Sequence, residues 1–226
     1  MRTFGIIVLC VVLVIGGGVA WCKRAYPTYT YRYRMTVEVM VDGAIRSGSS
    51  VIEVQIHTQP NLLANPTIVP KVRGEAVFVD LGGGRNVIAL LASGRNGNDV
   101  DSPYRLVPQL FRISYEDSDL PKLAGLRGHL DVPEKLLPTL VTFTDLNDPK
   151  SARVVQPAEF AQVFGPGVRF QRAWIEMTSD SISSGIKEKF PWIGNYAIET
   201  EFERTLRSAA PGGGSMTPGM NLKREH

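Results

Sequence analysis

The residues with the clearest chemical potential lie in the stretch AVFVDLGGGRNVIALL, residues 76–91. A hydrophobic run ends at Asp80 and Leu81, three glycines follow at Gly82–Gly84, and a second hydrophobic run begins. Glycines tolerate positive φ and can present consecutive backbone N–H groups to an anion such as a phosphate. The same residues suit a tight turn or a bulge between two paired strands. We favour the turn, because a lone short motif is weak support for a site.

Residues 77–84 resemble the second phosphate-binding motif of the actin and Hsp70-like ATPase superfamily, in which a strand ending Asp-Leu-Gly-Gly-Gly turns into another strand. The resemblance implies nucleotide binding by Gly82–Gly84. The chain departs from that family in three ways. Arg85 and Asn86 replace the usual small hydroxyl residue, no Asp-x-Gly-Thr strand lies upstream, and the two-lobed fold needs a longer chain. A hydrolase or nucleotide-binding protein that uses Gly82–Gly84 therefore remains the alternative function.

Histidines and carboxylates offer little for catalysis. His57 is expected on the solvent side of a strand, His129 in a loop and His226 in the C-terminal tail. Two carboxylates could act as acid and base only if the fold brought them together, which spacing along the sequence does not show. Four acidic residues could in principle take this role: Asp117, Asp119, Asp131 and Glu134. Because no G-x-S-x-G, H-E-x-x-H or C-x-x-C motif is present, we expect surface carboxylates and no catalytic residue.

The polar loop Ser93–Pro103 contains oxygen ligands that could imitate a calcium loop: Asn96, Asn98, Asp99 and Asp101. A calcium loop also needs a distal bidentate Glu and flanking helices, and this stretch lacks both. Turn composition explains the loop more simply. We expect no metal, no cofactor and no cofactor-binding residue.

Charge and cysteine usage exclude several function classes. The 25 Lys and Arg residues are scattered among 22 Asp and Glu residues, for a net charge of +3, so nucleic-acid binding has little support. The two cysteines, Cys10 and Cys22, both lie in or beside the N-terminal hydrophobic segment. The remainder of the chain therefore has no disulfide framework, zinc ribbon or cysteine nucleophile.

The N-terminal segment Phe4–Trp21 carries no charge, and its 18 residues can just cross a bilayer as a helix. Trp21 and the pair Lys23-Arg24 suit the membrane interface. We expect an uncleaved single-pass anchor in the inner or plasma membrane; a cleaved signal peptide, with small residues at Gly18–Ala20, stays open. Lys23 and Arg24 favour a cytoplasmic domain by the positive-inside rule. An apolar run at an N-terminus is more typical of export, so we expect the domain on the periplasmic side.

Alternation with period two predicts most of the strands. Residues Thr28–Val41 place Tyr29, Tyr31, Tyr33, Met35, Val37, Val39 and Val41 on one face. A second strand, 50–57, is expected to pair with the first through a long connection that includes Asp42-Gly43 and Ser47-Gly48. Further strands are expected at 75–81, 86–92, 139–145 and 168–178, with short helical segments after Pro157 and before Pro191.

The sum is a β-rich α+β fold with mostly antiparallel pairing and a few short helices. We expect an anchor or signal peptide at 1–24, a β-rich domain at 28–207 and a disordered tail at 208–226. The stretches YPTYTYRYRMTVEV, SGSSVIEV, GEAVFVDLG and SGIKEKFPWI make the chain similar to a group of uncharacterised bacterial proteins with one N-terminal membrane segment. That resemblance implies an anchor and no activity. We expect a non-enzymatic domain that binds a protein or a cell-envelope component.

Overall fold

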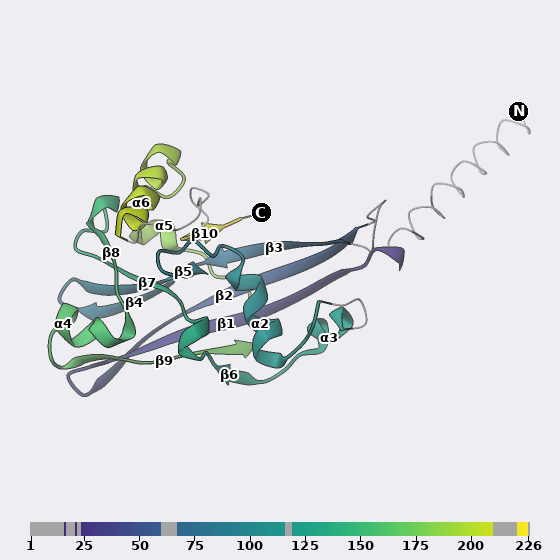
Figure 1. Ribbon diagram of the computed structural model, residues 1–226, viewed down its shortest axis with the longest axis horizontal. Helices are drawn as coiled ribbons and strands as arrows, with labels where there is room; N and C mark the ends of the chain where they lie inside the picture. Colours follow the sequence, from purple (N-terminus) through teal and green to yellow (C-terminus); the bar gives the residue numbers. More distant parts are fainter. Residues whose placement is uncertain are drawn as a thin grey trace, which may run out of the picture.

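The computed structural model describes residues 24–59, 67–115, 119–209 and 221–225, together with Gly16 and Trp21. These residues form two antiparallel sheets with short helices around them (Figure 1), which confirms the predicted β-rich α+β fold. The first sheet has the strand order β10 (Lys223–Arg224), β3 (Thr67–Glu75), β2 (Ala44–Gln59), β1 (Thr28–Val41), β9 (Val168–Met177) and β6 (His129–Asp131). The second has the order β4 (Val77–Gly82), β5 (Arg85–Ser93), β7 (Pro138–Phe143) and β8 (Ala152–Val154). The expected membrane segment Phe4–Trp21 lies outside the described residues except for Gly16 and Trp21. In the part of the chain that is described, no helix has the length and apolar character needed to cross a bilayer.

The first sheet is built around a long hairpin of β1 (Thr28–Val41) and β2 (Ala44–Gln59). A two-residue turn joins the strands, and both turn residues have positive φ, 49° at Asp42 and 86° at Gly43. This is the geometry of a type I′ turn, whose twist matches that of the paired strands. The prediction of a long connection between these two strands is therefore wrong. Ser47 and Gly48 lie within β2, opposite Glu38 and Val37 of β1.

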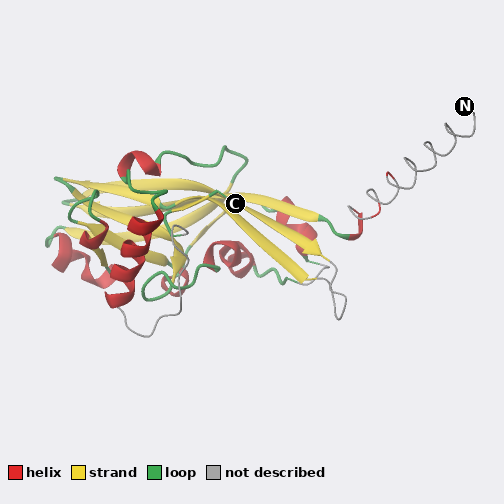
Figure 2. Cartoon of the chain, turned by 90° about the horizontal axis from the view of Figure 1, so that it is seen from above, coloured by secondary structure: helices red, strands yellow, loops and turns green. Residues whose placement is uncertain are grey.

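Four other strands complete the first sheet: β3 (Thr67–Glu75), β6 (His129–Asp131), β9 (Val168–Met177) and β10 (Lys223–Arg224). β3 lies beside β2, and Pro70 is tolerated there because β10 pairs only with Gly74 and Glu75 farther along. His129 was expected in a loop, but it pairs with Glu176 of β9. The ends of β1, β2 and β3 project beyond the body of the molecule on the side of the N-terminus (Figure 2).

The second sheet contains β4 (Val77–Gly82), β5 (Arg85–Ser93), β7 (Pro138–Phe143) and β8 (Ala152–Val154). The chain passes from the first sheet to the second at Ala76, between β3 and β4. β4 then crosses β2 closely at Gly48, where an added Cβ would lie 2.0 Å from the carbonyl oxygen of Phe78. A glycine at this position is what allows the two sheets to approach each other.

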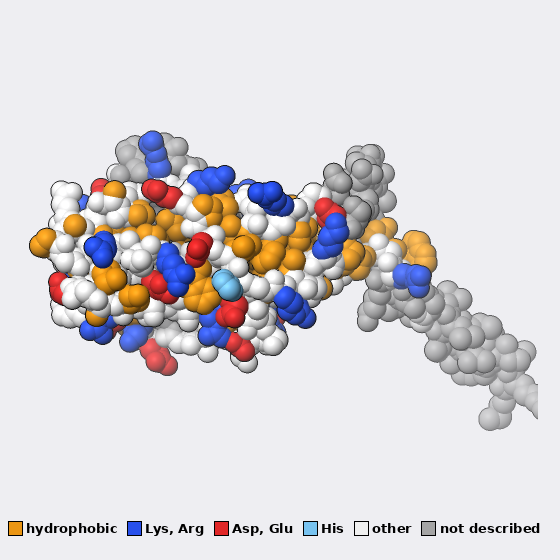
Figure 3. Space-filling model, turned by 90° about the horizontal axis from the view of Figure 1, so that it is seen from below, with side chains coloured by type: hydrophobic (Ala, Val, Ile, Leu, Met, Phe, Trp, Pro, Cys, Tyr) orange, Lys and Arg blue, Asp and Glu red, His pale blue; other side chains and the backbone are white. Residues whose placement is uncertain are grey.

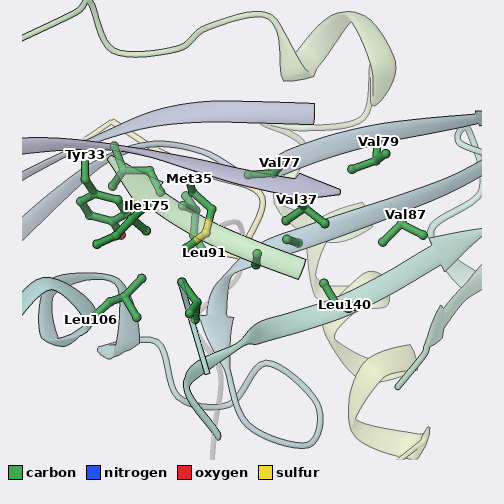
Figure 4. Packing of buried hydrophobic residues seen from close by; sticks show 14 of the residues in the cluster. Tyr33, Met35, Val37, Val77, Val79, Val87, Leu91, Leu106, Leu140 and Ile175 are labelled. Carbon is green, nitrogen blue, oxygen red and sulfur yellow. The ribbon is translucent and has the colours of Figure 1, made fainter. Parts of the chain in front are cut away.

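An inner hydrophobic cluster fills the space between the sheets (Figure 4). It contains the predicted face of β1, with Tyr33 1% exposed and Val37 0% exposed, together with residues of β4, β5 and β7 such as Val79 and Leu140. Helices α2 (Ser102–Phe111) and α3 (Leu120–Gly125) supply further members, Leu106 and Leu123 among them. The tyrosine hydroxyls of β1 remain satisfied, because Tyr31 and Tyr33 donate to the carbonyl oxygens of Tyr104 and Pro103.

An outer hydrophobic cluster covers the other face of the second sheet. Phe143 of β7 lies 5.0 Å from the ring centre of Phe190 and 5.6 Å from that of Phe202. Phe190 follows α5 (Ile186–Lys189), and Phe202 lies in α6 (Tyr196–Ala209). The second sheet is thus buried on both faces, between the first sheet and the two C-terminal helices.

The remaining short helical segments are η1 (Glu134–Leu136), η2 (Pro149–Ser151), η3 (Pro157–Glu159) and α4 (Phe160–Phe164). The helical segments expected after Pro157 and before Pro191 are confirmed. The prediction of a disordered tail at 208–226 is wrong for two stretches. Residues 208 and 209 end α6, and residues 221–225 form β10 with its neighbours; residues 210–220 and 226 lie outside the described residues.

Candidate functional site

The three glycines of the opening motif form the tip of the β4–β5 hairpin. Their φ values are 81°, 63° and 79°, and an added Cβ on any of them would meet nothing within 4 Å. Asp80 accepts a hydrogen bond from the Gly82 N–H at 2.8 Å, and Arg85 donates to the Gly82 carbonyl at 3.1 Å. Gly83 and Gly84 are exposed. The interpretation as a turn with a bulge is confirmed, since the strand register shifts between Asp80 and Gly82.

The residues that depart from the ATPase motif have structural roles at this turn. The Asn86 side chain is buried, donates to the Phe143 carbonyl at 2.9 Å and accepts from the Phe143 N–H at 2.9 Å. Arg85 reaches the carbonyl of Phe164 at 2.9 Å. Both side chains fasten the hairpin to neighbouring elements.

The acidic residues weighed for catalysis lie on separate elements. Asp119 precedes α3 and accepts hydrogen bonds from Lys122 and, less strongly, from Ser114, and both lower its pKa. Asp131 lies in β6, 3.7 Å from Arg172, and Glu134 is exposed in η1. Asp117 lies outside the described residues. No hydrogen bond or ion pair among the described residues joins one of these carboxylates to another.

The histidines and the polar loop after β5 are likewise engaged locally. His57 contacts the Thr28 hydroxyl at 2.9 Å through Nδ1, and His129 lies edge-on to Trp174 with ring centres 6.3 Å apart. His226 lies outside the described residues. Asp99, a candidate calcium ligand, is paired with Arg105 and with the Ser93 hydroxyl. Within the described ranges, no group of three His, Cys, Asp or Glu side chains is placed to hold a metal.

The outer face of the first sheet carries a polar network that the alternation predicted only in part. Glu53 points away from the core as expected, yet it is 3% exposed. Arg32 binds it at 2.7 Å, Arg73 at 3.4 Å and Gln55 at 3.0 Å. Residues 178–185 cross this face: the backbone carbonyl of Asp180 accepts from Arg32 at 3.1 Å, and the Ser183 N–H donates to the Val51 carbonyl at 3.2 Å. The network is internally satisfied, which is typical of a structural role.

A second polar cluster lies farther along the same face. Glu38 accepts hydrogen bonds from Arg172 at 2.9 Å and from the indole N–H of Trp174 at 3.2 Å. The hydrogen bond from Arg172 is the main reason that the pKa of Glu38 lies below its ordinary value. The guanidinium of Arg172 also lies 5.8 Å from the Trp174 ring centre, a cation–π distance. These groups are occupied by one another.

An open groove of about 830 Å³ lies where β7 begins and β8 ends. Its floor is held by the Thr139 hydroxyl, which donates to the Gly94 carbonyl at 2.6 Å, and by the Val155 N–H, which donates to the Leu140 carbonyl at 2.9 Å. The charged residues of its lining come from several segments of the chain: Arg95, Glu134, Lys135, Arg153 and Glu159. Polar and charged side chains thus stand on the rim of this groove.

The charges of this groove are not equivalent. Glu159 is committed to its own helix, because its carboxylate accepts the Gln156 N–H at 2.9 Å in a capping box. Arg95, Lys135 and Arg153 are exposed, and none lies within 4.0 Å of a carboxylate oxygen of the described residues. Sequence reasoning missed these cations. They are 18 to 58 residues apart, so no local motif could have joined them.

A second groove, of about 500 Å³, lies between the start of β1, α3 and the end of β9. Leu123, Leu126 and Met177 give it an apolar side, and Arg32 and Arg127 border it. Arg32 is already paired with Glu53.

Viewed from below, the molecule shows positive and negative side chains interspersed among hydrophobic ones (Figure 3). This mixed pattern agrees with the absence of a single-sign charge run in the sequence.

Comparisons with family models, with curated proteins and with solved structures each found no match for this chain. Arguments about function therefore rest on the geometry of its own residues.

Proposed function

We propose that the chain is a membrane-anchored, non-enzymatic domain that binds a protein or a cell-envelope component. The observation that carries the proposal is the groove at the end of the second sheet, which is open, polar and rimmed by the exposed cations Arg95, Lys135 and Arg153. Such a surface fits carboxylate or phosphate groups of a macromolecular ligand. The uncharged segment Phe4–Trp21 supports the anchor.

The absence of a catalytic constellation in the described residues supports a binding role. Glu134 is the one exposed carboxylate of the groove that does not cap a helix, and no histidine lines the groove. Acid–base catalysis needs a second titratable group within hydrogen-bond reach of the same reacting atom. The alternative, nucleotide binding or hydrolysis by Gly82–Gly84, gains no support from the geometry of an exposed turn.

Site-specific photocrosslinking in the producing cell tests the binding surface. In the test variants, a photoreactive residue replaces Lys135 or Arg153 on the groove rim. In the control variants, it replaces Tyr196 or Ile45, which are exposed elsewhere on the molecule. We expect a discrete adduct from the two rim positions. With the photoreactive residue in place of Arg95 instead, Lys135→Glu with Arg153→Glu should reduce the adduct about tenfold. Equal adducts from the Tyr196 and Ile45 controls would contradict the proposal.

Membrane attachment is tested separately, by fractionation and by a topology reporter fused after His226. We expect the chain in the membrane fraction, resistant to carbonate extraction, with the reporter active on the exported side. A chain that is released by carbonate has no anchor. A reporter active only in the cytoplasm would reverse the orientation, as Lys23 and Arg24 suggest.

A further inference from the structure

Residues 221–225 fill a slot between the two sheets, at the point where the chain passes from β3 to β4. We propose that this slot is a peptide-binding site for an extended segment with Leu and Arg two residues apart, and that the chain's own C-terminal segment is its tethered occupant. We refer to the slot as the β10 slot. It shares no lining residue with the groove of about 830 Å³.

The backbone of the segment is bound by both sheets. Ala76 N–H donates to the Leu222 carbonyl at 2.8 Å, and Leu91 N–H donates to the Asn221 carbonyl at 2.7 Å. Lys223 and Arg224 pair in antiparallel register with Glu75 and Gly74. Hydrogen bonding of this kind is how domains bind extended peptides by strand addition, because it recognises the backbone whatever its sequence.

Side chains of the segment provide the selectivity. Leu222 is 2% exposed and packs in the outer cluster with Ala76 and Leu90. Arg224 is 9% exposed and donates to the carbonyls of Leu91 and Val100 at 2.7 and 2.5 Å. The slot therefore recognises an apolar side chain and a guanidinium two residues later, both on the protein side of the strand.

The intervening residue adds a charge preference. Lys223 Nζ lies 3.5 Å from Glu75 Oε1, and Glu75 is 4% exposed. The other carboxylate oxygen of Glu75 accepts the Ile186 N–H at 2.9 Å. A buried carboxylate without a cationic partner is unfavourable, so the slot prefers a basic residue at this position.

The walls of the slot are held by contacts that do not involve residues 221–225. β3 pairs with β2 as far as Arg73, β4 pairs with β5 from Val77, and the Ser50 hydroxyl donates to the Glu75 carbonyl at 2.7 Å. If the segment leaves, the buried N–H groups of Ala76 and Leu91 lose their acceptors. Unpaired buried donors cost free energy, so an empty slot favours another extended strand.

The connection to α6 sets how strongly the segment competes with other ligands. Eleven residues, 210–220, separate the described part of α6 from Asn221, and four of them are glycines. Tethering a ligand through a linker of this length gives an effective concentration on the order of millimolar. A free peptide of equal affinity therefore fills half of the slots only near that concentration. Cutting the tether removes the competition.

A cleavable tether tests the proposal in the full chain. A recognition sequence for a site-specific protease is inserted between Gly213 and Gly214, and the purified chain is cut after it has folded. A fluorescent peptide with the sequence of residues 216–226 is then added, and binding is measured by anisotropy. Circular dichroism and a thermal melt before and after cleavage report whether the body of the protein stays folded.

We expect the labelled peptide to bind the cut chain at least about 100-fold more tightly than the uncut chain, as the effective concentration requires. Peptides with Leu222→Ala or Arg224→Ala should bind the cut chain about tenfold more weakly, since each loses buried contacts. A Glu225→Gln peptide is the matched control. Glu225 is exposed and forms an ion pair with Lys223 of the same segment at 2.8 Å, so the affinity of this peptide should change by less than about twofold.

Three results would overturn the proposal. In the first, the cut chain would unfold, which would make residues 221–225 an integral strand of the core. In the second, the cut fragment would stay bound without exchanging with the labelled peptide within a day, which would also make it an integral strand. In the third, the cut chain would stay folded, lose the fragment and bind no labelled peptide, so the slot would have no affinity for strands.

Discussion

The two hydrophobic clusters on either side of the second sheet are built from different residues and by different parts of the chain. The inner cluster is mainly aliphatic and comes from strands that alternate, with Val37 and Val54 both 0% exposed. The outer cluster is aromatic at its centre, where Phe143 contacts Phe190, Trp192 and Phe202. Alternation in the strands predicts the first kind of cluster. The second kind depends on helices far along the sequence.

The difference arises because the second sheet is buried on both faces. From Asn86 to Ala92, every residue of β5 is buried, including Ile88 toward the helices and Leu91 toward the first sheet. A strand buried on both sides reads as a continuous apolar run, with no alternation to show which layer covers it. A continuous apolar run in a sequence therefore indicates a covering layer on each side of its strand.

The largest expected effect comes from removing the centre of the outer cluster. Phe143→Ala should lower the free energy of unfolding by about 3–5 kcal/mol, because a large buried ring leaves a cavity among three other aromatic side chains. Val37→Ala in the inner cluster should cost about 2 kcal/mol. Urea denaturation followed by fluorescence and by far-UV circular dichroism measures both variants. If the clusters form one cooperative unit, the two probes give coincident transitions in each variant.

Two separated transitions in Phe143→Ala, with helix signal lost first, would mean that α5 and α6 unfold independently of the sheets. The inner and outer clusters would then belong to two folding units rather than to one.

Glu203 should make the outer layer sensitive to pH. It lies in α6 and is 3% exposed, and burial is the main cause that raises its pKa to about 7; Arg207 lowers it and Glu199 raises it further. The folded state therefore holds this proton more tightly than the unfolded state, whose carboxyl titrates near 4.5. Stability should fall as the pH rises from about 4.5 to 7, by no more than about 3 kcal/mol, and then level off.

Glu203→Gln should remove this slope and leave the variant more stable than the parent above pH 7, as measured by chemical denaturation at several pH values. Glu201→Gln, on the same helix and paired with Arg204, is the matched control and should keep the slope. A parent protein whose stability rises between pH 4.5 and 7 would show that other groups dominate.

Gly48→Ala probes the inner side, where β2 and β4 cross. The added methyl group would meet the Phe78 carbonyl oxygen at 2.0 Å, so the two backbones must separate. We expect a loss of about 2 kcal/mol, typical of overpacking that moves a backbone. Ser47→Ala, one residue earlier and exposed, should change stability by less than about 0.5 kcal/mol. Equal midpoints for the two variants in thermal melts would argue against close contact at the crossing.

The smallest expected effect is at the hairpin tip between the two clusters. Gly83 has a φ of 63° and open space around it, so Gly83→Ala should cost only the strain of a left-handed residue, about 1 kcal/mol. Calorimetric titration with ATP should show no binding by either the parent or the variant. Micromolar ATP binding that Gly83→Ala abolishes would restore the alternative function.

Much of the first sheet was predictable from the residues alone. The alternation of Thr28–Val41 gave the buried face of β1, and all predicted inward residues from Tyr31 to Val41 are buried. The long connection after Val41 was a misreading of Ser47 and Gly48, which resemble turn residues but pair within β2. Glycine there serves close approach between sheets, which no local pattern reveals.

The helices and the candidate sites were harder to predict. α2 was missed because Pro108 lies inside it, and α6 was missed because its buried residues are few: Phe202, Glu203 and Leu206. The groove and the β10 slot are assembled from segments distant in sequence. Residues 221–225 follow a stretch rich in Gly and Pro, so composition predicted disorder for a strand that both sheets bind.

The position of β1 has a mechanical consequence. It spans about 45 Å as a 14-residue strand, is separated from the N-terminal apolar segment by six residues, and lies between β2 and β9. A pull on the chain ahead of Thr28, directed along the strand, loads the hydrogen bonds to both neighbours in shear. Many bonds must then break together, whereas a hairpin pulled from its open end yields one bond at a time. The strand nearest the N-terminal segment is thus the one best placed to carry tension into the domain.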